Sequence, residues 1–256
     1  MKLFKRTCIT LLILIALLWI LLFLWVYYPL NNVVTTPVEK EQTELLLKKA
    51  NISVPEEFLE QKAKALKGAD VTYLAEDKED FAKTVLGDDV FQESENSFVC
   101  GDKKMLFSGK TVLIEGKDED IEKITKDTAA SIALAVLDKL KLSNIEMSNT
   151  IYEKEDGILV VFVPLFDGKI IYDAKIKILI SPDSSFKIEA VPISISKSGE
   201  RLLPCSPYSA ISEIALMDTA NGVQIIGMSL GYMLSNNKLI CVWEISTDDE
   251  NVYYVK

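Results

Sequence analysis

Histidine is absent from the 256 residues, and this absence excludes more chemistry than any motif in the sequence supports. Ser-His-Asp and Cys-His hydrolases, zinc hydrolases with histidine ligands and histidine general bases all need an imidazole. A serine-lysine pair or a single catalytic carboxylate survives in principle, but no such residue stands out among the many lysines and glutamates. We therefore expect that the chain is not an enzyme.

Motifs for cofactors, metals and nucleic acids are also missing. The 11 glycines form neither a GxxxxGK nor a GxGxxG pattern, so nothing predicts a phosphate-binding loop. No CxxC spacing is present, and basic residues do not alternate with aromatic ones as they do in nucleic-acid-binding domains. We expect no cofactor, no metal site and no nucleic-acid partner.

Cysteine is scarce, with four in the chain. Cys8 precedes a long apolar run, whereas Cys100, Cys205 and Cys241 follow it. An odd number in an exported part leaves at least one thiol unpaired. Two interpretations stay open: a disulfide between Cys205 and Cys241, or three small apolar residues in a setting that does not oxidise them.

Acidic residues are absent until Glu39, and the region before it contains an apolar run from Ile9 to Tyr28 that Lys2, Lys5 and Arg6 precede. At about 1.5 Å per residue, this run is long enough for a hydrocarbon core of roughly 30 Å. It exceeds the apolar region of a signal peptide, about 7–15 residues, and no small-x-small cleavage site follows. The sequence therefore predicts an uncleaved transmembrane helix over residues 9–28.

The basic residues before the run indicate the orientation of this helix. Positive charge favours the cytoplasmic side, so residues 1–8 are predicted to be a cytoplasmic stub and the rest to lie outside a cell membrane crossed once. Of 28 basic residues three precede the run, so 25 face 38 acidic ones outside and leave a net charge of −13. Such a body is repelled by polymeric phosphate and by anionic lipid heads.

Hydrophobic periodicity predicts an α+β fold, with helices packed on antiparallel sheets. We expect a small membrane-proximal α+β domain over residues 29–117 and a C-terminal α+β domain over 118–256. Helices are predicted over 38–50, 56–66, 80–86 and 118–142, and from Ser206 to about Gly222. Strands are predicted over 71–74, within 97–115, and over 151–153, 158–163, 169–180, 186–195, 223–233, 239–246 and 252–255.

The C-terminal part carries a set of motifs in a characteristic order. Ser-Leu-Gly-Tyr at 229–232 precedes Cys-Val-Trp-Glu-Ile-Ser-Thr-Asp-Asp at 241–249 and Val-Tyr-Tyr-Val at 252–255. Upstream lie the strand pair 160–162 and 168–172, and the leucine-rich segment 45–52 with Pro55. This order resembles the YycI regulatory proteins, from anchor to C-terminus. The chain departs from that family where Cys241 and Ile170 stand in place of prolines.

The resemblance implies a membrane-anchored, extracytoplasmic regulator that associates with a sensor histidine kinase and a related YycH-like membrane protein, in the cell-wall homeostasis of a Gram-positive type of cell. The predicted anchor has no charge and no GxxxG, so it would pack by shape around Ala16, Trp19 and Phe23. The signature residues are expected to preserve the fold: Leu230, Gly231, Tyr232, Trp243, Tyr253 and Tyr254. The alternative is a non-catalytic binding module for a cell-wall fragment or peptide, in a cleft lined by Trp243 and nearby tyrosines.

Overall fold

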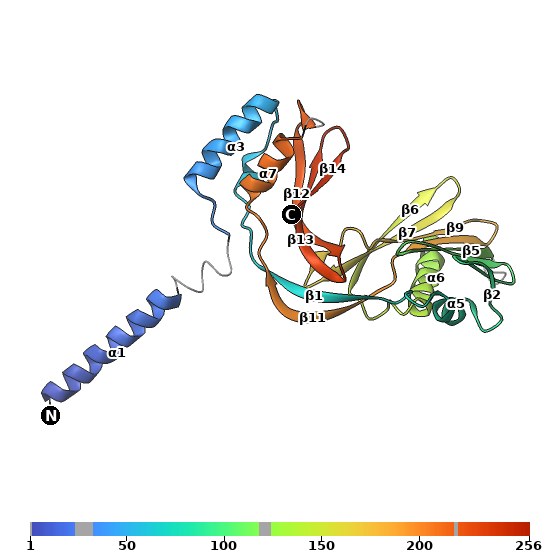
Figure 1. The fold of residues 1–256 in the computed structure, drawn as a ribbon, viewed down its shortest axis with the longest axis horizontal. Helices are drawn as coiled ribbons and strands as arrows, with labels where there is room; N and C mark the ends of the chain where they lie inside the picture. The colour runs from blue at the N-terminus through green and yellow to red at the C-terminus, as the bar shows by residue number, and fades with distance from the viewer. Residues whose placement is uncertain (1, 24–32, 118–123, 218–219) are drawn as a thin grey trace. The chain divides into compact units, whose positions relative to one another are not determined.

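The computed structural model describes residues 2–23, 33–117, 124–217 and 220–256, and it shows an α+β protein with helices and antiparallel sheets (Figure 1). The chain divides into two compact units, each formed from separated stretches of sequence. Unit 1 consists of Met1–Leu66, Arg201–Leu230 and Cys241–Lys256, and unit 2 of Lys67–Glu200 and Gly231–Ile240. This division differs from the predicted boundary at residue 117.

The N-terminal helix α1 spans Lys2–Leu22. Residues 24–28 of the predicted transmembrane segment lie outside the described residues. Among the helices that the structure describes, none combines the length and apolarity needed to cross a membrane, so the structure does not support the predicted span over residues 9–28. The apolar side chains from Leu12 to Phe23 are exposed along this helix.

Unit 1 contains three further helices, and two of them begin at residues whose side chains cap the first turn. Helix α3 (Pro37–Ala50) begins with a capping box between Thr36 and Glu39, and it ends at Asn51 in the left-handed conformation. Helix α7 (Pro207–Ala215) is capped by the Ser206 hydroxyl. It ends well before Gly222, and α4 (Glu56–Leu59) is only one turn long, so the helices predicted there are too long.

The core of unit 1 lies between these helices and strands β12 (Ile225–Ser235), β13 (Lys238–Thr247) and β14 (Val252–Val255). Strands β13 and β14 pair antiparallel, with Trp243 opposite Val255. Thr43 joins α3 to α7, because its hydroxyl lies 2.7 Å from the Ser212 hydroxyl. The largest fully buried side chain here is that of Trp243.

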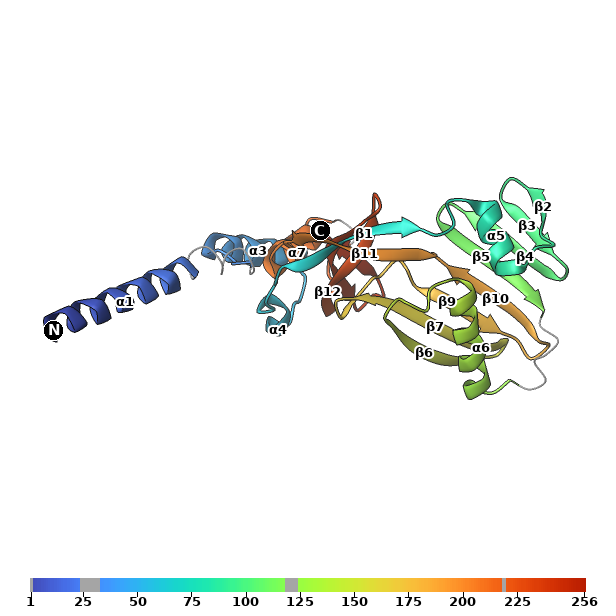
Figure 2. The same ribbon diagram turned by 90° about the horizontal axis from the view of Figure 1, so that it is seen from below.

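Unit 2 is built on a nine-stranded antiparallel sheet (Figure 2). Its strands are β2 (Phe91–Ser94), β3 (Ser97–Cys100), β4 (Lys103–Ser108), β5 (Thr111–Lys117), β10 (Ser185–Ala190), β9 (Ile176–Ile180), β7 (Gly157–Phe166) and β6 (Met147–Lys154), hydrogen-bonded in that order, with β8 (Lys169–Ile170) paired to β7. The first and last of these, β2 and β6, are the two edges of the sheet.

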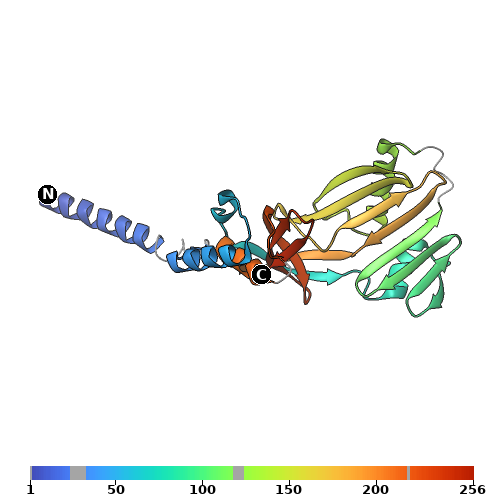
Figure 3. The same ribbon diagram turned by 90° about the horizontal axis from the view of Figure 1, so that it is seen from above.

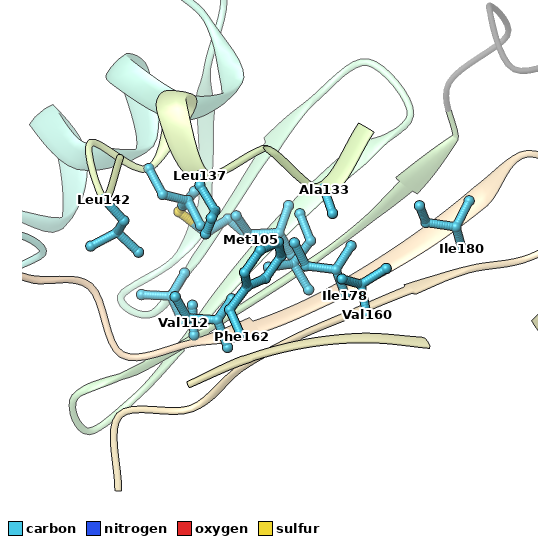
Figure 4. Close-up of a cluster of buried hydrophobic side chains, with 14 of the residues drawn as sticks. Met105, Val112, Ala133, Leu137, Leu142, Val160, Phe162, Ile178 and Ile180 are labelled. Carbon is cyan, nitrogen blue, oxygen red and sulfur yellow. The ribbon is translucent and has the colours of Figure 1, made fainter. Parts of the chain in front are cut away.

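Two helices cover one face of this sheet, namely α5 (Lys78–Leu86) and α6 (Lys126–Lys139). Their small and aromatic residues pack on alternate strand residues such as Met105, Val160 and Ile178, all of which are fully buried (Figure 4). The opposite face, seen in Figure 3, carries no helix in the described part of unit 2. It bears ion-paired residues such as Lys187 and Glu115. The alternation of apolar and charged residues predicts this one-sided burial.

Helix α6 is shorter than the predicted helix over residues 118–142. Its first turn is capped by Thr125, whose hydroxyl accepts the N–H of Thr128 at 3.3 Å. The acidic residues at 118–120 and 122, where the predicted helix begins, lie outside the described residues. The helix therefore begins at a threonine cap that the periodicity of the sequence did not reveal.

Two long strands complete the fold, β1 (Leu66–Tyr73) and β11 (Ile193–Leu202). They belong to a second sheet in which β11, β1, β13 and β12 are neighbours in that order and β14 pairs with β13. Within unit 2, Asp70 of β1 lies opposite Lys238 of β13. Lys238 also forms an ion pair of 3.0 Å with Glu200 of β11.

Candidate functional site

Of the three residues predicted to contact a partner, Ala16 and Trp19 lie on α1 and Phe23 directly follows its last residue. Ala16, Trp19 and Phe23 are separated by three and four positions, which puts them on one helical face. All three are exposed, and the exposed fractions of the two aromatic side chains are 69% for Trp19 and 53% for Phe23. These residues therefore form an accessible apolar surface, although nothing in the structure shows what covers it.

Trp243 lies in the core of unit 1 and is 1% exposed. Its indole N–H donates a hydrogen bond of 3.0 Å to the backbone carbonyl of Cys205. An indole that is enclosed and already bonded offers no face to a ligand. The expected ligand cleft lined by Trp243 is therefore wrong, because the ring faces the interior.

The other signature residues of unit 1 differ in how deeply they lie. Leu230 and Tyr253 are half-buried against the same core, and the phenolic oxygen of Tyr253 is buried with no hydrogen-bond partner among the described residues. Tyr254, the next residue of β14, points the other way and is 41% exposed. The contacts of Leu230 and Tyr253 are those of packing residues.

Gly231 and Tyr232 belong to unit 2 and hold a crossing of two chain segments. The Tyr232 ring is fully buried, its hydroxyl donates to the Lys67 carbonyl at 3.0 Å, and its own carbonyl accepts the N–H of Tyr172 at 2.9 Å. A Cβ atom on Gly231 would lie 2.7 Å from the Ile170 carbonyl oxygen and from the Tyr172 ring. Glycine is required here because the segment carrying Tyr172 passes directly against it.

A polar pocket in unit 2 is the site that the sequence analysis missed. It has a volume of about 190 Å³ and it opens beside Asp173. Both carboxylate oxygens of Asp173 accept the backbone N–H of Leu234, each at 3.0 Å. The pocket is lined by Thr111, Tyr172, Asp173, Lys175, Lys177, Glu189, Ala190 and Val191. The only sequence signal is that Asp173 interrupts the alternating pattern before Lys175.

The charges around this pocket are partly paired. Lys177 lies 3.3 Å from the Glu189 carboxylate, whereas the ammonium group of Lys110 lies 3.7 Å from the centre of the Tyr73 ring. Partial burial raises the pKa of the Asp173 carboxyl, and the Leu234 N–H and the positive charge of Lys110 counteract it. The pocket thus offers an acid, lysines and a hydroxyl to a small polar ligand.

A second pocket in unit 2 is apolar and lies between α5, α6 and the sheet. Its walls include Leu86, Val136 and Phe186, and its volume is about 50 Å³. Pockets for drug-sized ligands are typically about 300–1,000 Å³. This one accepts a small apolar group at most.

The three described cysteines, Cys100, Cys205 and Cys241, are free thiols. Burial raises the pKa of Cys205 to about 11, and the nearby carboxylate of Glu213 adds to the shift. Burial also raises the pKa of Cys241. Thiols of this kind are protonated at neutral pH and are poor nucleophiles. The described residues contain no group of three or more metal-ligating side chains.

Comparison with known proteins adds little to this description. No family model matches the chain, and no curated protein matches it. Among solved structures, the chain is similar to an uncharacterized protein from Eubacterium rectale ATCC 33656, with 14% identity, a TM-score of 0.46 and 88% of each chain covered. It is also similar to the C-terminal domain of Bacillus megaterium YpeB, with 12% identity, a TM-score of 0.32, and 87% of this chain and 98% of that chain covered. YpeB differs from the YycI regulatory proteins, which none of these comparisons supports specifically.

Proposed function

We propose that the protein is a membrane-anchored, extracytoplasmic regulator that associates with a sensor histidine kinase and a related YycH-like protein and modulates the kinase. The observation that carries the proposal is the row of exposed apolar side chains on α1, in a chain whose two units each have a hydrophobic core of their own. The apolar run from Ile9 to Tyr28 would be the anchor, with its N-terminus in the cytoplasm.

The arrangement of the signature residues supports a role without catalysis. Trp243 and Tyr232 are enclosed and hydrogen-bonded to backbone carbonyls, so their contacts preserve the fold and do not face a reacting molecule. The chain also has no histidine to act as a general base near neutral pH. A regulator needs only a surface that binds one state of its partner better than the other.

The anchor would supply that surface in the membrane. Helices in lipid associate by close packing and not by the hydrophobic effect, because lipid tails are as apolar as leucine. A face that combines the small Ala16 with the large Trp19 and Phe23 has the uneven surface into which another helix can pack closely. In this proposal, α1 would lie against a kinase helix and bias its two-state equilibrium.

The test is an in-membrane crosslink and affinity pull-down of the full-length protein. The native chain should recover a histidine kinase, whereas a version with an unrelated apolar helix in place of residues 9–28 should not. A third version, with Ala16→Leu, Trp19→Leu and Phe23→Leu, keeps the apolarity and should recover at most about a tenth as much kinase, because the loss of packing at three contacts exceeds about 1.4 kcal/mol.

Equal recovery of the kinase by all three versions would exclude the anchor contact. Recovery of no kinase by any of them would exclude the regulator and favour the alternative, an extracytoplasmic module that binds a wall fragment or peptide without catalysis. The polar pocket beside Asp173 favours that second candidate, since it offers charged and hydroxyl groups to such a ligand. Calorimetric titration with wall fragments would then be the next measurement.

A further inference from the structure

The two edges of the nine-stranded sheet in unit 2 differ in how well they are protected. At one edge, β2 has only four residues, and its pairing with β3 is irregular between Gln92 and Ser94. The carboxylate of Glu93 on this strand binds the Ser97 hydroxyl and the Lys104 ammonium group. Short length, irregular pairing and charge are the usual means by which a sheet edge avoids pairing with another chain.

The opposite edge strand is longer and regularly paired, and its charged residues, Glu153 and Lys154, are confined to its last two positions, where Glu153 pairs with Lys126 at 3.0 Å. Strand β6 pairs with β7 without a shift, from Met147 opposite Pro164 to Lys154 opposite Gly157. Its first six residues, Met-Ser-Asn-Thr-Ile-Tyr, carry no charge and no proline, and most of its side chains are exposed. No strand of the described residues pairs with its outer side. Its outward N–H and C=O groups therefore offer a regular ladder to another strand.

The charges at the ends of β6 indicate which strand fits this edge. Glu146 and Lys154 are exposed, and no ion pair joins either of them to another described residue. If a second copy of β6 pairs antiparallel about a twofold axis at Thr150, Glu146 of each copy lies opposite Lys154 of the other. The same register sets Ser148 opposite Tyr152.

Other registers lose this match. A twofold axis at Ile151 sets Glu146 opposite Asp156, which are like charges, and an axis at Asn149 sets Glu146 opposite the uncharged Tyr152. Directly opposite like charges destabilise a strand pair, whereas opposite charges stabilise it. A twofold axis midway between two neighbouring residues would pair odd-numbered with even-numbered positions. It would thus bring the apolar face of one sheet beside the charged face of the other. The axis at Thr150 is therefore favoured.

We propose that β6 is a homodimer interface, at which the sheets of two copies join through antiparallel β6 strands centred on Thr150. The two ion pairs between Glu146 and Lys154 determine the register. This inference goes beyond the proposed regulatory function and does not depend on it, because it uses neither α1 nor a kinase.

The test is sedimentation equilibrium of the full-length chain in detergent micelles, over a range of protein concentrations. The wild type should dimerise, and Glu146→Lys or Lys154→Glu should each raise the dissociation constant about tenfold, because two attractive pairs become two repulsive ones. An equimolar mixture of the two variants should recover wild-type affinity as a heterodimer, since each copy then supplies the charge that the other needs. The double variant E146K/K154E should also recover it.

The matched control is Asp89→Lys, which makes the same change of charge at an exposed residue just before the protected edge strand β2. It should leave the dissociation constant unchanged. A wild type that stays monomeric overturns the proposal. So does a dimer that both single variants leave intact, which would place the contact elsewhere, for example on α1. The proposal is also overturned if the single variants dimerise weakly but neither their mixture nor the double variant recovers the wild-type dissociation constant.

Discussion

At the scale of single residues, Asp173 is the side chain whose surroundings depart most from what its sequence context suggests. It remains exposed on one side and accepts the Leu234 N–H on the other. Partial burial raises the pKa of its carboxyl above the usual value of an aspartate. A carboxyl with a raised pKa in the folded state weakens the fold once it ionises, so its contribution falls as pH rises from below the ordinary pKa to above the raised one.

Replacement of Asp173 by asparagine should remove this pH dependence. The Asp173→Asn variant keeps an oxygen that can accept the Leu234 N–H, but it has no proton to lose. We expect the free energy of unfolding of the variant to become larger, relative to that of the wild type, as pH rises from 3 to 7, because only the wild type loses stability on ionisation. Urea unfolding at several pH values measures this difference, which should be small because the exposed side of the carboxylate is screened by solvent.

Asp183 provides the matched control, because the pKa of its carboxyl is lowered, mainly by the Ser185 hydroxyl at 2.6 Å. A group of this kind stabilises the fold above its unfolded pKa, and the benefit is lost as pH falls through the folded pKa. The free energy of unfolding of Asp183→Asn should therefore become smaller, relative to that of the wild type, as pH rises. The same trend for both variants would show that burial does not control Asp173.

At the scale of secondary structure elements, β12 shows how two glycines on one strand serve different purposes. A Cβ atom at Gly231 would lie 2.7 Å from the Ile170 carbonyl oxygen, which is backbone and cannot move aside. A Cβ atom at Gly227 would lie 3.5 Å from the Ser246 side chain, which is an ordinary contact. Only Gly231 is required by the close approach of another segment.

Gly231→Ala should lower the free energy of unfolding by about 1–3 kcal/mol, since the added methyl group overpacks the site against Tyr172. Gly227→Ala should leave it unchanged or raise it by up to about 1 kcal/mol, because alanine restricts the unfolded chain. Denaturant unfolding of the two variants measures both values. Equal effects of the two substitutions would show that the close approach at Gly231 is relaxed without cost.

The sequence predicted most of these elements, because amphipathic patterns and capping residues are local signals. The helix over 38–50, the cap at Ser206 and the three C-terminal strands are confirmed. The helix over 56–66 is wrong beyond Leu59, since Leu66 already begins β1. Leu66 is buried at the start of β1, and helical periodicity over a thinly apolar segment does not reveal where a strand begins.

At the scale of the whole molecule, the two units have separate hydrophobic cores. The core of unit 2 includes Ile178 at the centre of the large sheet, and the core of unit 1 includes Ile245 beside Trp243. No residue belongs to both clusters, and both isoleucines are fully buried. Substitutions at sites that share no partners usually have additive effects on stability.

Ile178→Val and Ile245→Val should each lower the free energy of unfolding by about 1 kcal/mol, because each removes one buried methyl group. The double variant should therefore lose about 2 kcal/mol. Urea unfolding of the full chain, followed by circular dichroism and by tryptophan emission, measures all three. A loss in the double variant that departs from the sum by more than about 0.5 kcal/mol would show that the cores are energetically coupled.

What the sequence could not predict is long-range. The polar pocket combines Thr111, Asp173 and Glu189, which come from three separate segments, and no local pattern connects them. The pairing of β5 with β10, in which Ile114 lies opposite Ile188, likewise joins strands on both sides of the predicted boundary at residue 117. The anchor, the partner and the regulatory role stay predictions.

The discontinuity of unit 1 has a consequence for the order in which the protein matures. Its first segment, up to Leu66, leaves the ribosome long before Trp243, Ile245 and Val255, which complete the same core. While Lys67–Glu200 is being synthesised, helix α3 therefore lacks the C-terminal strands that complete its core. A nascent chain halted before Trp243 would carry an unfinished first unit, and so a ribosome stalled there would present an exposed apolar surface to the cell's chaperones and proteases.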